Sequence, residues 1–198
     1  KGILSANNGE AIKLIIEEFK LCGYHVTYKL INSAQFGIPQ KRERVFIVGF
    51  REKEQFSKFC FPKPSIDDPK LGVSIKNIIQ SDKKLTENYF FSDKAVKGLL
   101  KTKNRKTMNK GRAQDINGPS NTVSAHLAKV SLNSTDPVLK VDGKFRMFTP
   151  REVARIQSFP DSFKLANSKT WNYLALGNAV PPVMMWYVAQ QLASALND

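Results

Sequence analysis

The segment that most constrains the fold is residues 36–51, where a charged stretch leads directly into an uninterrupted apolar run. Residues 45–50 contain no polar side chain and are rich in β-branched and aromatic types. This composition indicates a strand that is buried on both faces. Gly37 and Pro39 mark a turn immediately before it. The chain is therefore expected to build a sheet around this strand.

Three polar side chains stand at alternate positions at the entrance of this strand. If the extended backbone begins at Gln40, then Gln40, Arg42 and Arg44 lie on one side, because side chains alternate across a strand. Two guanidiniums and an amide would then converge on one point. A salt-bridged strand entrance with Glu43 as the partner explains the same pattern, so the residues alone leave both interpretations open.

The preceding residues predict a helix and a second strand. Residues 7–21 have an amphipathic helical pattern, and Asn7 with Glu10 resembles a capping box. Gly23 stands where a left-handed C-terminal cap is expected. Residues 24–31 alternate as a strand does. Helix, strand, loop and strand follow one another as they do at the end of an open α/β sheet, and we expect the two strands to pair antiparallel.

The C-terminal half carries a hairpin signal and a strong helix start. The dipeptide at residues 142–143 is Asp-Gly, which supplies the positive φ angles of a type I′ turn between strands at 138–141 and 144–148. Thr149, Pro150 and Glu152 form the pattern of a capping box with proline at the first helical position. We expect Glu152, Arg151 and Arg155 to form an internal ion-pair network.

Two further helices are predicted at the C-terminus. The first spans residues 167–176, and residues 177–182 form a tight loop after it. The second begins at Pro182, at the position where proline is favoured. Its apolar stripe is expected to face the core, and consists of Met184, Val188, Leu192 and Ala195.

The charge of the chain favours a polyanionic partner. Its 31 Lys and Arg against 17 Asp and Glu give a formal net charge of +14, so nucleic acid is the first candidate. No apolar run approaches the roughly 20 residues needed to span a bilayer, so we predict no membrane partner. Cys22 and Cys60 lack metal-ligand spacing, and we expect reduced thiols in an intracellular protein and no metal. Residues 94–112 contain eight Lys or Arg, and either a solvated loop or a phosphate-binding surface explains them.

Three motifs, in this order, resemble the last three sequence motifs of the DNA cytosine-5 methyltransferases. They are GIPQKRER at residues 37–44, TPREVARIQSFPDSF at 149–163 and GNAVPP at 177–182. In that family the stretch between the first two motifs holds the target-recognition domain, and Asn121-Thr122-Val123 is similar to its Thr-Val signature. The likeness covers nearly the whole chain but only the C-terminal half of a complete enzyme.

The resemblance implies a fold and a domain organisation. The fold class is α/β: the C-terminal part of a Rossmann-like methyltransferase sheet with an inserted, irregular and mostly-β target-recognition domain. Residues 1–55 would be the C-terminal part of the catalytic domain. Residues 56–165 would be the target-recognition domain with its organising helix, and residues 166–198 would return to the catalytic domain.

The resemblance also implies a reaction. In the family a cysteine adds to C6 of a cytosine flipped out of duplex DNA, and C5 then takes the methyl group of S-adenosylmethionine. Arg44 would hydrogen-bond the cytosine O2 and stabilise charge on the ring, while Arg42 and Gln40 would orient the nucleophile loop and the extruded nucleotide. Asn178 and Ala179 would lie against the methionine end of the cofactor.

The partner expected on the same basis is double-stranded DNA, which is methylated in a restriction-modification system of the bacterial cytoplasm. Thr122 would contact the backbone beside the flipped base, and basic side chains would hold phosphates. The expected DNA-binding residues are Thr122, Ser124, Lys103, Arg105, Lys106, Lys110 and Arg112.

The chain departs from the family pattern because the glycine-rich cofactor loop, the Pro-Cys nucleophile loop and the Glu-Asn-Val motif are absent. Neither Cys22 nor Cys60 follows a proline as that motif requires. We therefore expect a truncated enzyme or one chain of a two-chain enzyme, inactive without the N-terminal half that carries the nucleophile. Two alternatives stay open: a non-catalytic DNA-binding or specificity module, and part of a tRNA cytosine-5 methyltransferase.

Overall fold

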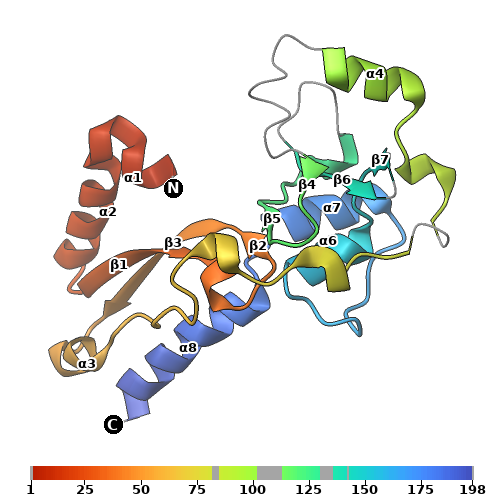
Figure 1. Ribbon diagram of the computed structural model, residues 1–198. Helices are drawn as coiled ribbons and strands as arrows, with labels where there is room; N and C mark the ends of the chain where they lie inside the picture. The colour runs from red at the N-terminus through yellow and green to blue at the C-terminus, as the bar shows by residue number, and fades with distance from the viewer. Residues whose placement is uncertain (1, 82–84, 102–112, 130–135, 142, 198) are drawn as a thin grey trace.

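The computed structural model describes residues 2–81, 85–101, 113–129, 136–141 and 143–197, and Figure 1 shows their arrangement. The N-terminal strands and the last helix lie together in one part of the molecule. The short strands and helices of residues 113–178 lie in the other part. Within the described residues, no helix combines the length and the apolar character that crossing a membrane requires.

The first part is built on the predicted antiparallel pair. Strand β1 (His25–Asn32) pairs with β3 (Glu43–Phe50), from His25 opposite Phe50 to Asn32 opposite Glu43. Helix α8 (Pro182–Asn197) covers one face of this pair. Its predicted stripe is confirmed as core, because Met184, Val188 and Ala195 are buried and Leu192 packs beside them.

The expectation that β3 is buried on both faces was wrong for the face turned away from α8. Val48 and Phe50 pack against α8 and are buried, whereas Val45 and Ile47 are only half-buried. Among the described residues β3 pairs with β1 alone, and α2 (Glu10–Leu21) lies along β1, away from α8. The second face of β3 therefore keeps partial contact with solvent.

The start of α2 corrects a second prediction. Asn7 and Asn8 have left-handed φ angles of 48° and 55°, in a 3₁₀ turn, η1 (Ala6–Gly9), that follows the short helix α1 (Gly2–Ser5). The N-cap is Gly9, with no side-chain cap, so Asn7 closes no capping box. The predicted end is confirmed: Gly23 has φ 84°, and the N–H of Tyr24 bonds the carbonyl of Phe19, as in a Schellman motif.

The second part contains a small sheet and the predicted hairpin. Strand β6 (Val138–Val141) pairs antiparallel with β7 (Lys144–Arg146) and parallel with β4 (Ala113–Gln114). Gly143 has φ 80°, as the turn requires. A separate parallel pair joins β2 (Gln40–Lys41) to β5 (Ser120–Asn121). This pair links the two parts of the molecule.

Helix α6 (Pro150–Ile156) begins as predicted. Thr149 and Glu152 form a complete capping box with Pro150 in the first turn. Glu152 also forms a fully buried ion pair with Arg146, at 2.9 Å, and Arg155 pairs with Asp161 at 2.7 Å. The prediction of one internal ion-pair network was therefore wrong: Glu152 and Arg155 each pair with a different residue, the second pair lies at the surface, and Arg151 donates to the backbone carbonyl of Phe163.

Helix α7 (Lys169–Asn178) begins after the N-cap Ser168 and continues through Gly177 and Asn178, which the sequence pattern had placed in a loop. Gly177 packs directly on the backbone of Ser124 and Ala125, where the Cβ of any other residue would overlap these atoms. Tyr173 and Leu176 share one buried cluster with Phe148 and Val153, so this core crosses the boundary predicted at residue 165.

The remaining elements are short. The helices are α3 (Lys53–Lys58) and α4 (Asp93–Lys101), and the 3₁₀ turns are η2 (Ser33–Phe36), η3 (Pro69–Leu71), η4 (Ile75–Asn77), η6 (Glu87–Tyr89) and η7 (Leu127–Lys129).

Candidate functional site

The backbone of Val123 is held from both sides by the strand entrance. The Val123 N–H donates to Oε1 of Gln40 at 2.9 Å, and the Val123 carbonyl accepts from Nη1 of Arg42 at 3.0 Å. Thr122 next to it donates its hydroxyl to the carbonyl of Lys41 at 2.7 Å. Residues 120–123 are therefore fixed against residues 40–42 by the β2–β5 pair and by these side chains.

Arg42 connects this segment to the end of α7. Its side chain is 1% exposed, and Nη2 donates to the carbonyls of Gly177 at 2.8 Å and Ala179 at 3.0 Å. Burial, with a smaller contribution from the nearby charge of Arg44, lowers the pKa of Arg42 to about 10. Arg42 thus acts inside the protein, where it joins three backbone segments.

Gln40 extends the same network to the organising helix. Its Nε2 donates to Oε1 of Gln157 at 2.9 Å, and Gln157 in turn donates to the carbonyl of Leu176. Both glutamine side chains are fully buried. Buried polar groups of this kind stabilise a fold only when they are all paired, and here each glutamine has partners on two different segments.

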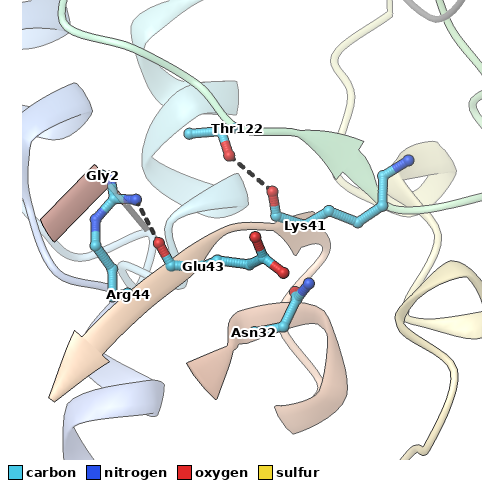
Figure 2. A pocket seen from close by; sticks show the side chains of 6 residues that line it. All are labelled: Gly2, Asn32, Lys41, Glu43, Arg44 and Thr122. Carbon is cyan, nitrogen blue, oxygen red and sulfur yellow. Dashed lines mark hydrogen bonds between the residues drawn. The ribbon is translucent and has the colours of Figure 1, made fainter. Parts of the chain in front are cut away.

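Arg44 lies in a cavity of about 560 Å³ beside this network, lined by Gly2, Asn32, Lys41, Glu43, Arg44 and Thr122. Figure 2 shows Arg44 and Thr122 on the walls of this cavity. The Arg44 side chain is half-buried and Nη1 donates to the carbonyl of Glu43 at 2.8 Å. Burial lowers the pKa of Arg44 from its ordinary value.

The predicted convergence of Gln40, Arg42 and Arg44 is therefore correct in part. Gln40 and Arg42 meet at Val123, but Arg44 lies in the cavity, because β2 ends at Lys41 and β3 begins only at Glu43. The hydrogen bonds described for both guanidiniums go to backbone carbonyls. Bonds from both arginines to backbone carbonyls favour a polar site at the strand entrance over a salt bridge with Glu43.

Other predicted site residues lie apart from this cavity. The Ser124 hydroxyl donates to Asp136 and accepts from the His126 N–H, so it serves a turn within the chain. Asn178 ends α7 with an exposed side chain. The five basic residues expected to bind DNA lie outside the described residues, and are Lys103, Arg105, Lys106, Lys110 and Arg112.

The end of α7 is the place where cofactor-binding residues were expected. Asn178 presents an amide, and Val180 beside it is 44% exposed. An exposed carboxamide can both donate a hydrogen bond to a polar group and accept one from it. In the part of the chain that the structure describes, no group of three or more His, Cys, Asp and Glu is placed to hold a metal ion.

Sequence reasoning missed Gln157, Gly177 and Arg146. Gln157 and Gly177 act through partners far along the chain, which no local pattern reveals. Arg146 is an ordinary strand residue in the sequence, and its alternation with Phe145 gave no sign that it would be buried. The sequence predicted cationic partners for Glu152 but named Arg151 and Arg155, whereas the ion pair forms with Arg146.

Chains of known structure that share this fold include two methyltransferases. The S. pombe Dnmt2 methyltransferase superposes with a TM-score of 0.71 at 17% identity, over 100% of this chain and 65% of that chain. The Entamoeba histolytica methyltransferase EhMeth superposes with a TM-score of 0.70 at 16% identity, over 95% of this chain and 59% of that chain.

The sequence itself gives the family. Residues 1–194 match the model of the C-5 cytosine-specific DNA methylases, and the chain belongs to that family. It is 33% identical to the type II methyltransferase M.FnuDI of Fusobacterium nucleatum, with 100% of this chain and 63% of the relative covered. It is 32% identical to the type II methyltransferase M.HaeII of Haemophilus aegyptius, with 100% of this chain and 59% of the relative covered.

The chain thus spans roughly three fifths of the length of these relatives, which match the whole of it within one longer polypeptide. The comparisons give no support to a separate partner chain of a two-chain enzyme.

Proposed function

We propose that this chain is the C-terminal part of a type II DNA cytosine-5 methyltransferase, which methylates C5 of a flipped cytosine in duplex DNA of the bacterial cytoplasm. The observation that carries the proposal is the attachment of Thr122 and Val123 to residues 40–42 beside the Arg44 cavity. The family match and the type II relatives support the same reaction.

Arg44 would hold the target base. Its guanidinium is half-buried in a cavity of about 560 Å³, with donors besides the one used by Glu43. A preorganised donor at the cytosine O2 stabilises the negative charge that develops when a nucleophile adds to the ring. Desolvation strengthens such an interaction, because the effective dielectric constant falls.

Thr122 would fix the backbone of the extruded nucleotide at the mouth of the same cavity. Gln40 and Arg42 would position Thr122 through Val123 and so act without touching the substrate. Residues 56–165 would supply most of the recognition of DNA. Arg44 would therefore contact the reacting cytosine, and the buried side chains of Gln40 and Arg42 would position Thr122.

S-adenosylmethionine, when bound, would supply an electrophilic methyl group. Asn178 and Ala179 would contact its methionine part. The Ala179 carbonyl accepts from Arg42, so Arg42 would hold the cofactor side and the recognition side in one arrangement. The nucleophile would come from sequence outside these 198 residues, since neither Cys22 nor Cys60 lines the Arg44 cavity.

A DNA substrate is favoured over tRNA by the DNA methylase family model and the type II relatives. The structural likeness to Dnmt2, at 17% identity, reflects the shared fold. A purely non-catalytic module is disfavoured because the Arg44 cavity keeps the polar walls that a reacting base requires.

The test is transfer of tritiated methyl groups to duplex DNA and to tRNA. We expect the 198-residue chain alone to give no signal above a blank without protein, and the product of the complete reading frame to methylate DNA. Methylation of DNA by the isolated chain would contradict the proposal that the nucleophile lies outside these 198 residues. Transfer to tRNA at a rate equal to or above that for DNA would overturn the substrate assignment.

A further inference from the structure

A second cavity of about 240 Å³ adjoins the Arg44 cavity and shares Lys41 with it. Its walls are Lys41, Lys70, Ala113, Gln114, Asp115, Gly118, Pro119 and Asn121. The two cavities also meet along the recognition segment, where Asn121 lines the second and Thr122 the first. A strand whose nucleotide occupies the first cavity would therefore bring its neighbouring phosphate close to the second.

The floor of the second cavity is fixed by hydrogen bonds. The Ser120 N–H donates to the carbonyl of Pro39 at 3.0 Å, and the Asn121 N–H donates to Oε1 of Gln114 at 2.6 Å. The first bond lies beside the β2–β5 pair, and the second joins β5 to the side chain of Gln114 on β4. Hydrogen bonds therefore hold the backbone at Ser120 and Asn121, beside the second cavity.

Lys41 and Lys70 give the second cavity its positive charge. Figure 2 shows the Lys41 side chain extended away from Arg44, on the far side of Thr122. No hydrogen bond or ion pair is described for either ammonium in the part of the chain that the structure covers. The carboxylate of Asp115, also in the wall, accepts two hydrogen bonds from Asn117.

We propose that Lys41 and Lys70 bind the phosphates of the target strand next to the flipped cytosine. This proposal rests on the function proposed above. Arg44, Lys41 and Lys70 would then follow one strand of DNA out of the base cavity. Phosphate contacts of this kind fix the position of a duplex without reading its sequence. The loss of each should weaken binding to all sequences alike.

The experiment measures duplex binding by the product of the complete reading frame from 50 to 200 mM salt. The logarithm of the binding constant falls with the logarithm of salt concentration with a slope of about −0.9 per neutralised phosphate. We expect Lys41→Gln and Lys70→Gln each to reduce that slope by about 1, and the double variant by about 2. The affinity ratio between DNA with and without the target site should stay constant.

The control is Lys13→Gln with Lys20→Gln, which removes the same net charge from the exposed face of α2. An unchanged slope in the Lys41/Lys70 double variant, or an equal reduction in the control, would overturn this assignment and leave the proposed function standing. Absence of duplex binding by the unsubstituted protein would contradict both.

Discussion

The side-chain amides of Gln40 and Gln157, 117 residues apart in the chain, are joined by a buried hydrogen bond of 2.9 Å. Gln40 also holds the N–H of Val123, and Gln157 also holds the carbonyl of Leu176. Two glutamines therefore join four segments of the chain, at residues 40, 123, 157 and 176. The geometry around Arg44 depends on residues that do not line its cavity.

The first prediction concerns Gln157. Gln157→Leu should lower the free energy of unfolding by about 1–3 kcal/mol, because Nε2 of Gln40 and the carbonyl of Leu176 lose their partner inside the protein. Urea denaturation measures the effect. Gln190→Leu, on the exposed side of α8, should change stability much less, and an equal effect of the two substitutions would contradict the account of the network.

The second prediction concerns Gly177. Gly177→Ala should destabilise the protein by about 1–3 kcal/mol, because its Cβ overlaps the backbone of Ser124 and Ala125, although alanine is the better helix former. Thermal unfolding measures this. At Gly118 a Cβ meets no atom within 4 Å, so Gly118→Ala should have little effect. A stabilised Gly177→Ala variant would show that α7 does not need this close approach.

The third prediction concerns the buried pair of Arg146 and Glu152. Glu152→Gln should cost about 3–5 kcal/mol of stability, because it leaves the Arg146 charge buried without compensation. Asp161→Asn breaks the ion pair with Arg155 at the surface and should cost far less. Denaturation in urea compares them, and the reverse order would be inconsistent with the described burial.

The fourth prediction concerns alkaline pH. Burial raises the pKa of Tyr173, with further contributions from Tyr89 and Glu152, and the hydroxyl donates to the carbonyl of Phe148. Above the unfolded pKa of about 10, the folded state keeps a proton that the unfolded state loses. Stability should therefore fall as the pH rises through this range, by up to about 1.4 kcal/mol per pH unit.

Tyr173→Phe isolates this contribution. The variant should be less stable than the unsubstituted protein at pH 8, by about 1 kcal/mol for the lost hydrogen bond. This difference should shrink between pH 10 and pH 11, because phenylalanine cannot ionise. Chemical denaturation at several pH values checks it, and a difference that is independent of pH would contradict the assignment to Tyr173.

Local signals in the sequence predicted much of the fold. The hairpin before Thr149, the capping box and the stripe on α8 are each specified within about fifteen residues, and each is confirmed. The start of α2 was wrong because Asn7 adopts a left-handed conformation in a turn that precedes the helix. Asparagine suits both an N-cap position and the left-handed αL conformation. Residue type alone therefore does not show which of these two roles Asn7 has.

The sequence predicted which residues belong to the candidate site, but not which of them are buried or which backbone groups they bind. The motif order brought Gln40, Arg42 and Arg44 together with Thr122. Which arginine is buried depends on the break between β2 and β3 and on carbonyls at Gly177 and Ala179. These contacts join positions about 135 residues apart, and strand alternation carries no information about them.

Arg44 is proposed to act on the target base while the buried network of Gln40, Arg42 and Gln157 holds the surrounding segments. The most direct measurement is the rate of methyl transfer to DNA by the product of the complete reading frame carrying Arg44→Ala. If Arg44 acts as one preorganised donor, kcat should fall by about 10² to 10³, with DNA binding and unfolding temperature close to those of the unsubstituted protein. An unchanged kcat in the folded, DNA-binding variant would contradict the claim.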